Sequence, residues 1–208
     1  MNNNFKIRTI EIKDALATLD IYKPYVQNTG VSFEYEPPTL EEWQTRIKTY
    51  TINYPWLVCE YNNQIIGYTY AGSHRSRTAY SWDVETAVYL LDKYHRLGIA
   101  KILYESLFAL LKLQNYVNVY AIITIPNVKS EEFHQKLGFT EIGIFKKTGY
   151  KLGAWHNTRW FQLHLSEHQL NPDIPKPFTE ILNTKEVNII FETASLKLNN
   201  KAIKILNV

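Results

Sequence analysis

The amino-acid sequence predicts an α/β (α+β) protein in which helices flank a mixed, largely antiparallel central sheet. Two observations support this prediction. Strand-like and helix-like patterns alternate along the chain, which indicates that a sheet and its helices share one core. Several neighbouring strand patterns are joined by only a few residues, and such short connections suit antiparallel pairs.

The composition is that of an ordinary globular domain. Of the 208 residues, 45% are hydrophobic, so the chain can bury a core and is neither disordered nor fibrous. The net charge of +3 argues against a nucleic-acid partner that is bound through a broad basic face. Cys59 is the only cysteine, which excludes an internal disulfide and argues against a zinc-thiolate site.

The chain shows no pattern of a secretory signal or a membrane span. The N-terminal residues lack an apolar stretch, and charged residues such as Lys101 and Glu105 interrupt the longest apolar run, 99–113. We therefore expect a cytoplasmic protein without a membrane partner.

The first half of the chain is expected to contain two helices and four strands. Alternating apolar residues indicate a strand at 5–10, and a helical pattern follows from Asp14. Thr39 and Glu42 form a capping-box pattern, which predicts the start of the second helix. Asn62-Asn63 suits the turn of a hairpin between the first two of three further strands, at 56–61, 64–71 and 80–91.

The second half begins with the clearest helix, whose apolar stripe extends from Ile99 to Leu111. An apolar, β-branched run at 117–125 predicts the next strand. Asn127 is a good N-cap for a shorter helix, and Gly138 suits its left-handed end. The last two strands of the sheet are expected at 140–151 and 156–165.

The composition changes after His168, where three prolines indicate a linker. We therefore divide the chain into a main domain at 1–168 and a C-terminal extension at 169–208. Within the extension, alternating apolar residues at 187–198 predict a strand or hairpin. Such an element could cover a sheet edge, pack on a partner subunit or be mobile.

The turn before the third helix has the features of an anion site. Gly98 and Ala100 leave the free N–H groups at the start of the helix accessible, and helix N-termini attract phosphate. Lys93, Arg96 and Lys101 add positive charge nearby. A glycine at such a turn is also common where nothing binds, so the loop alone leaves both interpretations open.

Two motifs resemble those of the GNAT superfamily of acyl-CoA-dependent N-acetyltransferases. The family loop reads Arg/Gln-x-x-Gly-x-Gly/Ala, and this chain has His95-Arg96-Leu97-Gly98-Ile99-Ala100, with histidine at the first position. The late helix of the family reads Asn…Leu-Gly-Phe, as do Asn127 and Leu137-Gly138-Phe139 here. The resemblance implies the GNAT fold, acetyl-CoA as the cofactor, no metal, and coenzyme contacts from Val88, Tyr89, Leu90, His95, Arg96, Leu97, Gly98, Ile99, Ala100, Lys101, Asn127 and Ser130.

Longer stretches are similar to phosphinothricin N-acetyltransferases, and the similarity extends from about residue 6 to residue 165. They read NTGVSFE at 28–34, EPPT at 36–39, RTAYSW at 77–82, ETAVY at 85–89 and GAWHN at 153–157. This similarity implies acetyl transfer to the amine of a small amino-acid-like substrate, such as phosphinothricin or methionine sulfoximine. It also implies a homodimer.

The same similarity implies that Glu85 and His134 are catalytic. Glu85 lies in an otherwise apolar run, and a carboxylate there could take the proton of an ammonium group. The alternative is a strand glutamate that faces solvent. His134 could donate or accept a proton, and its role as acid, base or structural residue stays open. The backbone groups of Val88 and Leu90 are expected to pair with the pantetheine arm.

Candidate substrate-binding residues precede the Glu85 strand. The guanidinium groups of Arg75 and Arg77 suit a carboxylate or phosphinate, and Tyr80 lies close to them in sequence. The resemblance adds Phe33. Two other functions stay open: acetylation of a protein N-terminus or lysine, and a degenerate module that binds acyl-CoA without turnover.

Overall fold

A seven-stranded sheet forms the centre of the computed structural model, which describes residues 4–206. The strands follow the order β1-β2-β3-β4-β5-β7-β6, and every neighbouring pair is antiparallel except β4 and β5. The predicted mixed, largely antiparallel sheet is therefore confirmed. The strands are β1 (Phe5–Thr9), β2 (Trp56–Tyr61), β3 (Gln64–Ser73), β4 (Asp83–Leu90), β5 (Asn118–Ile125), β6 (Thr140–Lys151) and β7 (Ala154–His164).

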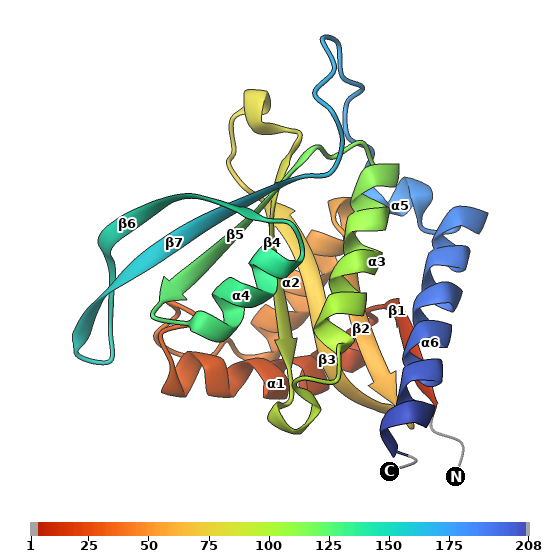
Figure 1. The fold of residues 1–208 in the computed structure, drawn as a ribbon, viewed down its shortest axis with the longest axis horizontal. Coiled ribbons are helices and arrows are strands. Elements are labelled where there is room, and N and C mark those ends of the chain that lie inside the picture. Colours follow the sequence, from red (N-terminus) through yellow and green to blue (C-terminus); the bar gives the residue numbers. More distant parts are fainter. Residues whose placement is uncertain (1–3, 207–208) are drawn as a thin grey trace.

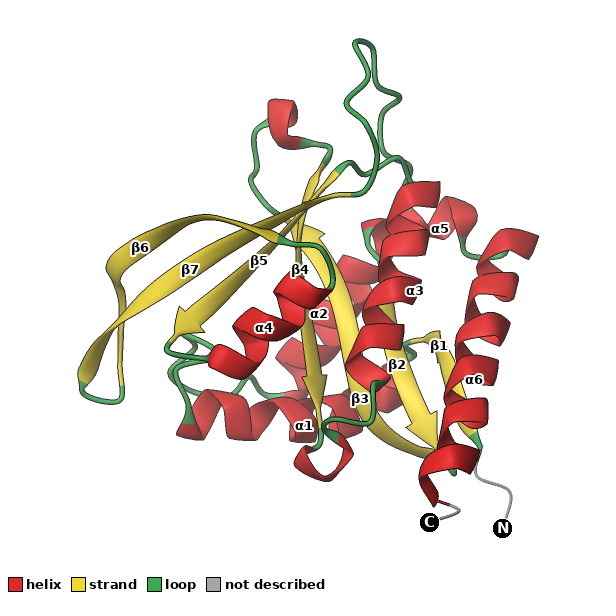
Figure 2. Ribbon diagram, viewed as in Figure 1, coloured by secondary structure: helices red, strands yellow, loops and turns green. Residues whose placement is uncertain are grey.

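Helices cover both faces of this sheet (Figure 1), as the colouring by secondary structure in Figure 2 also shows. Helices α1 and α2 pack on one face, and α3 and α6 pack on the other. No helix within residues 4–206 is long and apolar enough to cross a membrane. The helices are α1 (Ala15–Asn28), α2 (Leu40–Asn53), α3 (Ile99–Leu113), α4 (Val128–Lys136), α5 (Phe178–Ile181) and α6 (Lys185–Leu206), with short 3-10 turns η1 (Ile12–Asp14), η2 (Thr78–Tyr80) and η3 (Asp92–Tyr94).

Each face of the sheet carries its own hydrophobic core. The apolar stripe of α3 is buried as the sequence predicted, and Leu103, Leu107 and Leu110 are completely inaccessible. The opposite core is aromatic, with the rings of Trp43 on α2 and Trp56 on β2 meeting edge to face at a centroid distance of 5.4 Å. Large rings in this geometry bury much apolar area and fix α2 against the sheet.

The local signals in the sequence are found where they were expected. The Thr39 hydroxyl accepts from the Glu42 N–H, and the Glu42 carboxylate accepts from the Thr39 N–H, so the capping box is formed. The Asn127 side chain accepts from the Ser130 N–H and caps α4. Asn62 and Asn63 both have positive φ, which suits the tight turn between β2 and β3.

Strands β4 and β5 diverge, which leaves part of β4 unpaired. Their parallel ladder contains only three pairs, from Asp83↔Asn118 to Glu85↔Tyr120. Beyond that point β5 continues beside β7, and β4 continues beside β3 (Figure 1). The N–H of Leu91 donates to β3, and backbone groups alternate in direction along a strand, so those of Val88 and Leu90 face the diverging side.

The prediction of a strand or hairpin at 187–198 is wrong, because these residues lie within helix α6. The buried residues are Val187, Ala194 and Leu198, with Ile190 and Phe191 partly buried between them. This spacing of three, four and seven residues defines one face of a helix. The short run 188–191 also fits an alternating pattern, and a run of that length cannot distinguish the two structures.

Helix α6 covers the edge strand β1, which is one of the three roles considered for the extension. The N–H of Phe5 donates to Asn199 Oδ1 at 2.7 Å, and the N–H of Ile7 donates to Ser195 Oγ at 2.9 Å. Asn199 Nδ2 in turn donates to the Phe5 carbonyl at 2.9 Å. Side chains of α6 thereby satisfy backbone groups that an open sheet edge would expose.

Candidate active site

Glu85 lies opposite Tyr120 at the last paired position of β4 and β5, where the two strands separate. Its Oε1 is 2.8 Å from Nδ1 of His74, and its side chain is 36% exposed. The side chain of His74 is only 6% exposed, because its ring stacks on Tyr120 and contacts the edges of Tyr80 and Trp160. The family motif pointed to Glu85, and nothing in the sequence singled out His74.

A second contact of His74 determines which of its nitrogens carries the proton. Nε of Arg75 is 3.3 Å from Nε2 of His74, and a guanidinium nitrogen can only donate a hydrogen bond. Nε2 therefore accepts, and the proton of a neutral imidazole lies on Nδ1, which donates to Glu85. The Arg75 guanidinium also lies over the ring of Tyr80, 5.3 Å from its centroid.

The predicted anion loop has the backbone geometry of an open helix N-terminus. Gly98 is the N-cap of α3 with a φ of 79°, and no side chain caps this helix. Arg96 also adopts a left-handed conformation, with a φ of 63°. Ile99 is buried in the core, whereas Leu97 and Ala100 are partly buried and Arg96 is exposed. The first N–H groups of α3 are therefore not used by a capping side chain.

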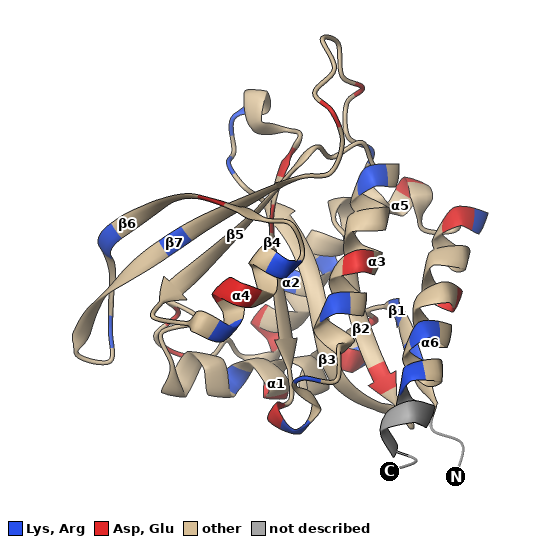
Figure 3. Ribbon diagram, viewed as in Figure 1, with Lys and Arg blue, Asp and Glu red and all other residues tan. Residues whose placement is uncertain are grey.

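Positive charge gathers at this end of α3 from two parts of the chain (Figure 3). Lys101 is exposed on the first turn of α3 and lies 3.8 Å from Glu105, which also contacts Lys197 of α6. A Cβ at Gly98 would lie 2.1 Å from Nζ of Lys201, so this lysine of α6 lies directly against the loop. No motif in the sequence predicts that Lys201 lies here, because its position depends on how α6 packs.

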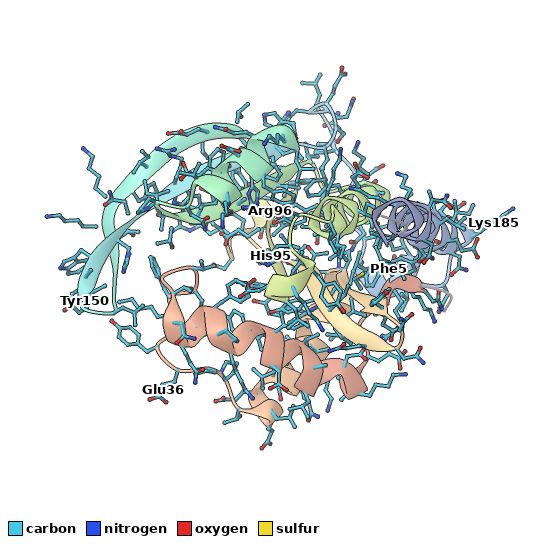
Figure 4. All side chains as sticks on the ribbon, turned by 60° about the horizontal axis from the view of Figure 1, so that its bottom comes forward. Phe5, Glu36, His95, Arg96, Tyr150 and Lys185 are labelled. Carbon is cyan, nitrogen blue, oxygen red and sulfur yellow. The ribbon has the colours of Figure 1, made fainter. Side chains whose placement is uncertain are left out.

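His95 turns back toward the end of β4. Its Nε2 is 3.3 Å from the Leu90 carbonyl, to which the Tyr25 hydroxyl donates at 2.8 Å. Figure 4 shows His95 and Arg96 at neighbouring positions of the turn, near the middle of this side of the molecule. The neighbouring Tyr89 belongs to the aromatic core and is 9% exposed. Val88 and Leu90 direct their backbone groups to the diverging side of β4, and of these two residues Val88 is the one whose carbonyl has no side-chain partner in the described region.

His134 is buried on α4 among aromatic rings. Its Nδ1 lies 2.8 Å from the Ser130 carbonyl, which can only accept, so Nδ1 carries the proton. Its Nε2 then accepts from the Tyr104 hydroxyl at 3.3 Å. Burial lowers the pKa of His134 below the ordinary value of 6.5, and burial likewise raises the pKa of Tyr104. The imidazole is therefore neutral near pH 7.

Glu85 and His134 lie on opposite faces of the sheet. The side chain of Glu85 points to the same face as that of Tyr89, which packs with α1 and α2. His134 lies with Tyr104 and Phe161 on the α3 face. A ligand that occupied the diverging edge of β4 would therefore have the carboxylate on one side and the Tyr104–His134 pair on the other.

Three of the four predicted substrate residues share one pocket. Arg75, Arg77 and Tyr80 line a cavity of about 320 Å³ between the loop that follows β3 and the linker near Ile174. Phe33 lies elsewhere, against Gly149 of the β6–β7 hairpin. No group of three or more His, Cys, Asp or Glu residues within the described part of the chain could hold a metal ion.

These features together define a class of protein. An open strand edge beside an uncapped helix N-terminus, with a carboxylate where the strands separate, is the arrangement of an acyl-CoA-dependent acyltransferase. Residues 7–160 match the family model described as acetyltransferase (GNAT) domain. The chain belongs to this family, and it is an N-acetyltransferase.

Similar proteins and structures agree with this assignment. The chain is 35% identical over 176 residues to the phosphinothricin N-acetyltransferase of Streptomyces viridochromogenes, covering 85% of this chain and 96% of that protein. It is 28% identical to an L-methionine sulfoximine/L-methionine sulfone acetyltransferase of Salmonella typhimurium, over 78% and 95% of the two chains. A Sinorhizobium meliloti GNAT superfamily phosphinothricin acetyltransferase, solved in complex with AcCoA, has a TM-score of 0.78 and 30% identity, covering 89% of this chain and 100% of that one.

Proposed function

We propose that this chain transfers the acetyl group of acetyl-CoA to the amine of a small amino-acid-like substrate, such as phosphinothricin or methionine sulfoximine. One observation carries the proposal. The Glu85 carboxylate is partly exposed where β4 and β5 separate, next to the unpaired edge of β4. The names of the similar proteins supply the substrate class.

The acetyl donor lies along the diverging edge of β4. The backbone groups of Val88 pair with the pantetheine arm as a neighbouring strand would, and the Asn127 side chain has an amide donor left for the same arm. The free N–H groups at Gly98 and Ala100 bind the pyrophosphate at the start of α3. Arg96, Lys101 and Lys201 contribute positive charge there, which suits the anionic coenzyme.

Glu85 starts the reaction by removing a proton from the substrate ammonium group, directly or through water. The free amine then attacks the thioester carbonyl, and the Val88 N–H stabilises the oxyanion that forms. Collapse of this intermediate breaks the carbon–sulfur bond, and the proton that the attacking nitrogen must still lose neutralises the released thiolate of coenzyme A. His134 lies on the α3 face, where its Nε2 accepts a hydrogen bond from the Tyr104 hydroxyl, and it takes part in this second half of the reaction by orienting that hydroxyl.

The substrate anion binds beside the loop that carries Arg75, Arg77 and Tyr80. Guanidinium groups form paired hydrogen bonds with carboxylate and phosphinate oxygens, and these three residues share one pocket. The contact between Arg75 and His74 links this pocket to Glu85. Phe33 packs against Gly149 of the β6–β7 hairpin, outside this pocket, and we assign it no contact with the substrate anion.

We also infer a homodimer that works in the cytoplasm. The outer strands β6 and β7 expose apolar side chains, among them Phe145 at 51% and Trp155 at 61%, and a second copy would cover such a surface. Cys59 is a buried free thiol, which suits a reducing compartment. Light scattering measures the mass of the particle directly.

A substrate panel tests the proposed function. Release of free thiol from acetyl-CoA is measured with phosphinothricin, methionine sulfoximine, methionine sulfone, the common amino acids and peptides with a free N-terminus. We expect turnover with amino-acid-like amines that carry an acidic or strongly polar end. Turnover with peptides alone would instead indicate a protein acetyltransferase, and coenzyme binding without turnover on any amine would indicate a binding module.

A further inference from the structure

The side chain of His74 is unusually buried and closely packed for a residue in a surface loop. It follows Ser73 at the end of β3, yet only 6% of its side chain is exposed. Its ring lies parallel to that of Tyr120 at a centroid distance of 4.3 Å, and Tyr80 and Trp160 meet it edge-on at about 6 Å. These contacts allow the imidazole little freedom to rotate away from Glu85.

The hydrogen bonds of His74 determine which of its ring nitrogens donates and which accepts. Arg75 donates to Nε2, which leaves the proton on Nδ1, and Nδ1 donates to Oε1 of Glu85 at 2.8 Å. None of the described residues hydrogen-bonds the other oxygen of Glu85, Oε2. The arrangement occupies one carboxylate oxygen and leaves the second for a proton that arrives from a substrate.

We propose that His74 is the positioning residue of the general base: it holds Glu85 turned so that Oε2 faces the substrate amine, while Arg75 fixes the tautomer of His74. The proposal deepens the proposed function and rests on it. A hydrogen bond donated to the ionised carboxylate favours the charged form, and only the charged form can take the ammonium proton. A fixed rotamer also removes the need to orient the base in each turnover.

His74 is not the base in this scheme. Its side chain is far less exposed than that of Glu85, at 6% against 36%, and Arg75 covers the nitrogen that would have to accept a proton. Arg75 thus has two tasks, because it lines the proposed substrate pocket and its Nε donates to His74. Recognition of the substrate anion and orientation of the base are therefore coupled through two consecutive residues.

The environment of the pair contains few other ionisable groups. Arg75 and Tyr80 face it from the loop, Tyr120 from β5 and Asp83 from the start of β4. Burial raises the pKa of Tyr120, so this residue does not titrate on the acidic side of neutrality. Asp83 accepts from Asn118 and lines the same pocket as Arg75, so Asp20→Asn, which removes an exposed carboxylate on α1, is the control for a change of charge.

Two substitutions separate the hydrogen bond from the packing. His74→Asn keeps an amide donor at the position of Nδ1 but loses the stacked ring, whereas His74→Phe keeps a ring on Tyr120 but has no donor. The pH profile of kcat/KM is measured for both variants, for Asp20→Asn, and for His74→Phe combined with Glu85→Gln. Thermal melting of each variant checks the fold.

We expect His74→Phe to lower kcat/KM by about 10- to 100-fold, the effect of losing one hydrogen bond to a charged group. The acidic limb of its profile should move to higher pH. In contrast, His74→Asn should retain the position of the wild-type limb, and Asp20→Asn should retain the wild-type activity. In the Glu85→Gln background, His74→Phe should have little further effect. An unshifted limb in His74→Phe, or an equal loss in both backgrounds, would overturn the proposal.

A measurement that does not depend on turnover separates this inference from the proposed function. Nitrogen NMR of the imidazoles should show a neutral His74 with its proton on Nδ1, and this signal should change in Glu85→Gln. A proton on Nε2 would contradict the proposal even in an active enzyme. If the tautomer is as described but no amine in the substrate panel is acetylated, the proposed function fails and the hydrogen bonding of the pair stands.

Discussion

At the scale of single residues, the chemistry of the site depends on which face of the sheet a side chain occupies. Glu85 points to the aromatic face, and the Tyr104–His134 pair lies on the α3 face. A thioester placed at the diverging edge of β4 would have a proton acceptor on the side of the amine. On the side of the thiolate it would have a buried hydroxyl whose proton is held by a neutral imidazole.

The burial of His134 predicts a pH-dependent stability. Its pKa is lowered by burial, so below the ordinary value of 6.5 the unfolded chain binds a proton that the folded chain does not. The free energy of unfolding should therefore fall as the pH decreases from about 7.5 to about 5.5. Urea denaturation across this range should show a smaller decrease for His134→Gln than for the wild type.

The same variant reports on catalysis. We expect His134→Gln to lower kcat while the dissociation constant of acetyl-CoA changes less than about threefold, since the backbone contacts proposed for the coenzyme do not involve this side chain. A collapse of coenzyme affinity would show instead that His134 supports the architecture of the site. In the urea denaturation experiment, an equal change of the free energy of unfolding with pH in His134→Gln and in the wild type would contradict a neutral, buried imidazole.

At the scale of elements, helix α6 is the feature with the largest consequence outside the family-matched range of residues 7–160. It adds Val187, Ala194 and Leu198 to the core beneath α3 and covers the edge of β1 with polar side chains. Its last described side chain, Lys201, reaches the loop at Gly98. Helix α6 thus covers one edge of the sheet and adds positive charge near the proposed coenzyme site.

Replacing Asn199 by alanine tests the role of α6 at the sheet edge. The substitution removes the acceptor of the Phe5 N–H and the donor to the Phe5 carbonyl. We expect a loss of about 1–3 kcal/mol in the free energy of unfolding, measured by urea denaturation. The control is Lys197→Ala on the same helix, whose ion pair with Glu105 is exposed and should contribute less than about 1 kcal/mol. Equal effects of the two substitutions would rule out edge capping.

Most elements could be predicted because their signals are local. The stripe from Ile99 to Leu111, the capping box at Thr39 and the N-cap at Asn127 depend on residues a few positions apart. The prediction of a strand or hairpin at 187–198 is wrong because alternation over a few residues also fits one face of a helix.

The site was predictable to the extent that family motifs carry it. Glu85 and the Gly98 loop lie in such motifs, whereas His74 and Lys201 gain their positions through packing against Tyr120 and through the course of α6. Tyr104 lies on the buried stripe of α3 and hydrogen-bonds to His134. The sequence pattern of a buried stripe does not distinguish such a residue from one that only packs.

At the scale of the whole molecule, the two halves of the sheet differ in how they are covered. The continuous half, β1 to β4, is covered on both faces and along its edge, and it provides a rigid support for the unpaired edge of β4. The other half, β5 to β7, extends away from it (Figure 1) and exposes the apolar side chains that we assign to a second copy. In the proposed function, the acetyl donor and acceptor meet where the two halves separate.

The most direct test of the account is the pH dependence of acetyl transfer by Glu85→Gln. With methionine sulfoximine or phosphinothricin as the amine, kcat/KM should fall by about 100-fold or more below the pKa of the substrate amine, where a proton must be removed. The loss should shrink as the pH rises and the amine deprotonates without help. A variant that keeps the wild-type rate across the whole pH range would contradict the central claim that Glu85 is the base.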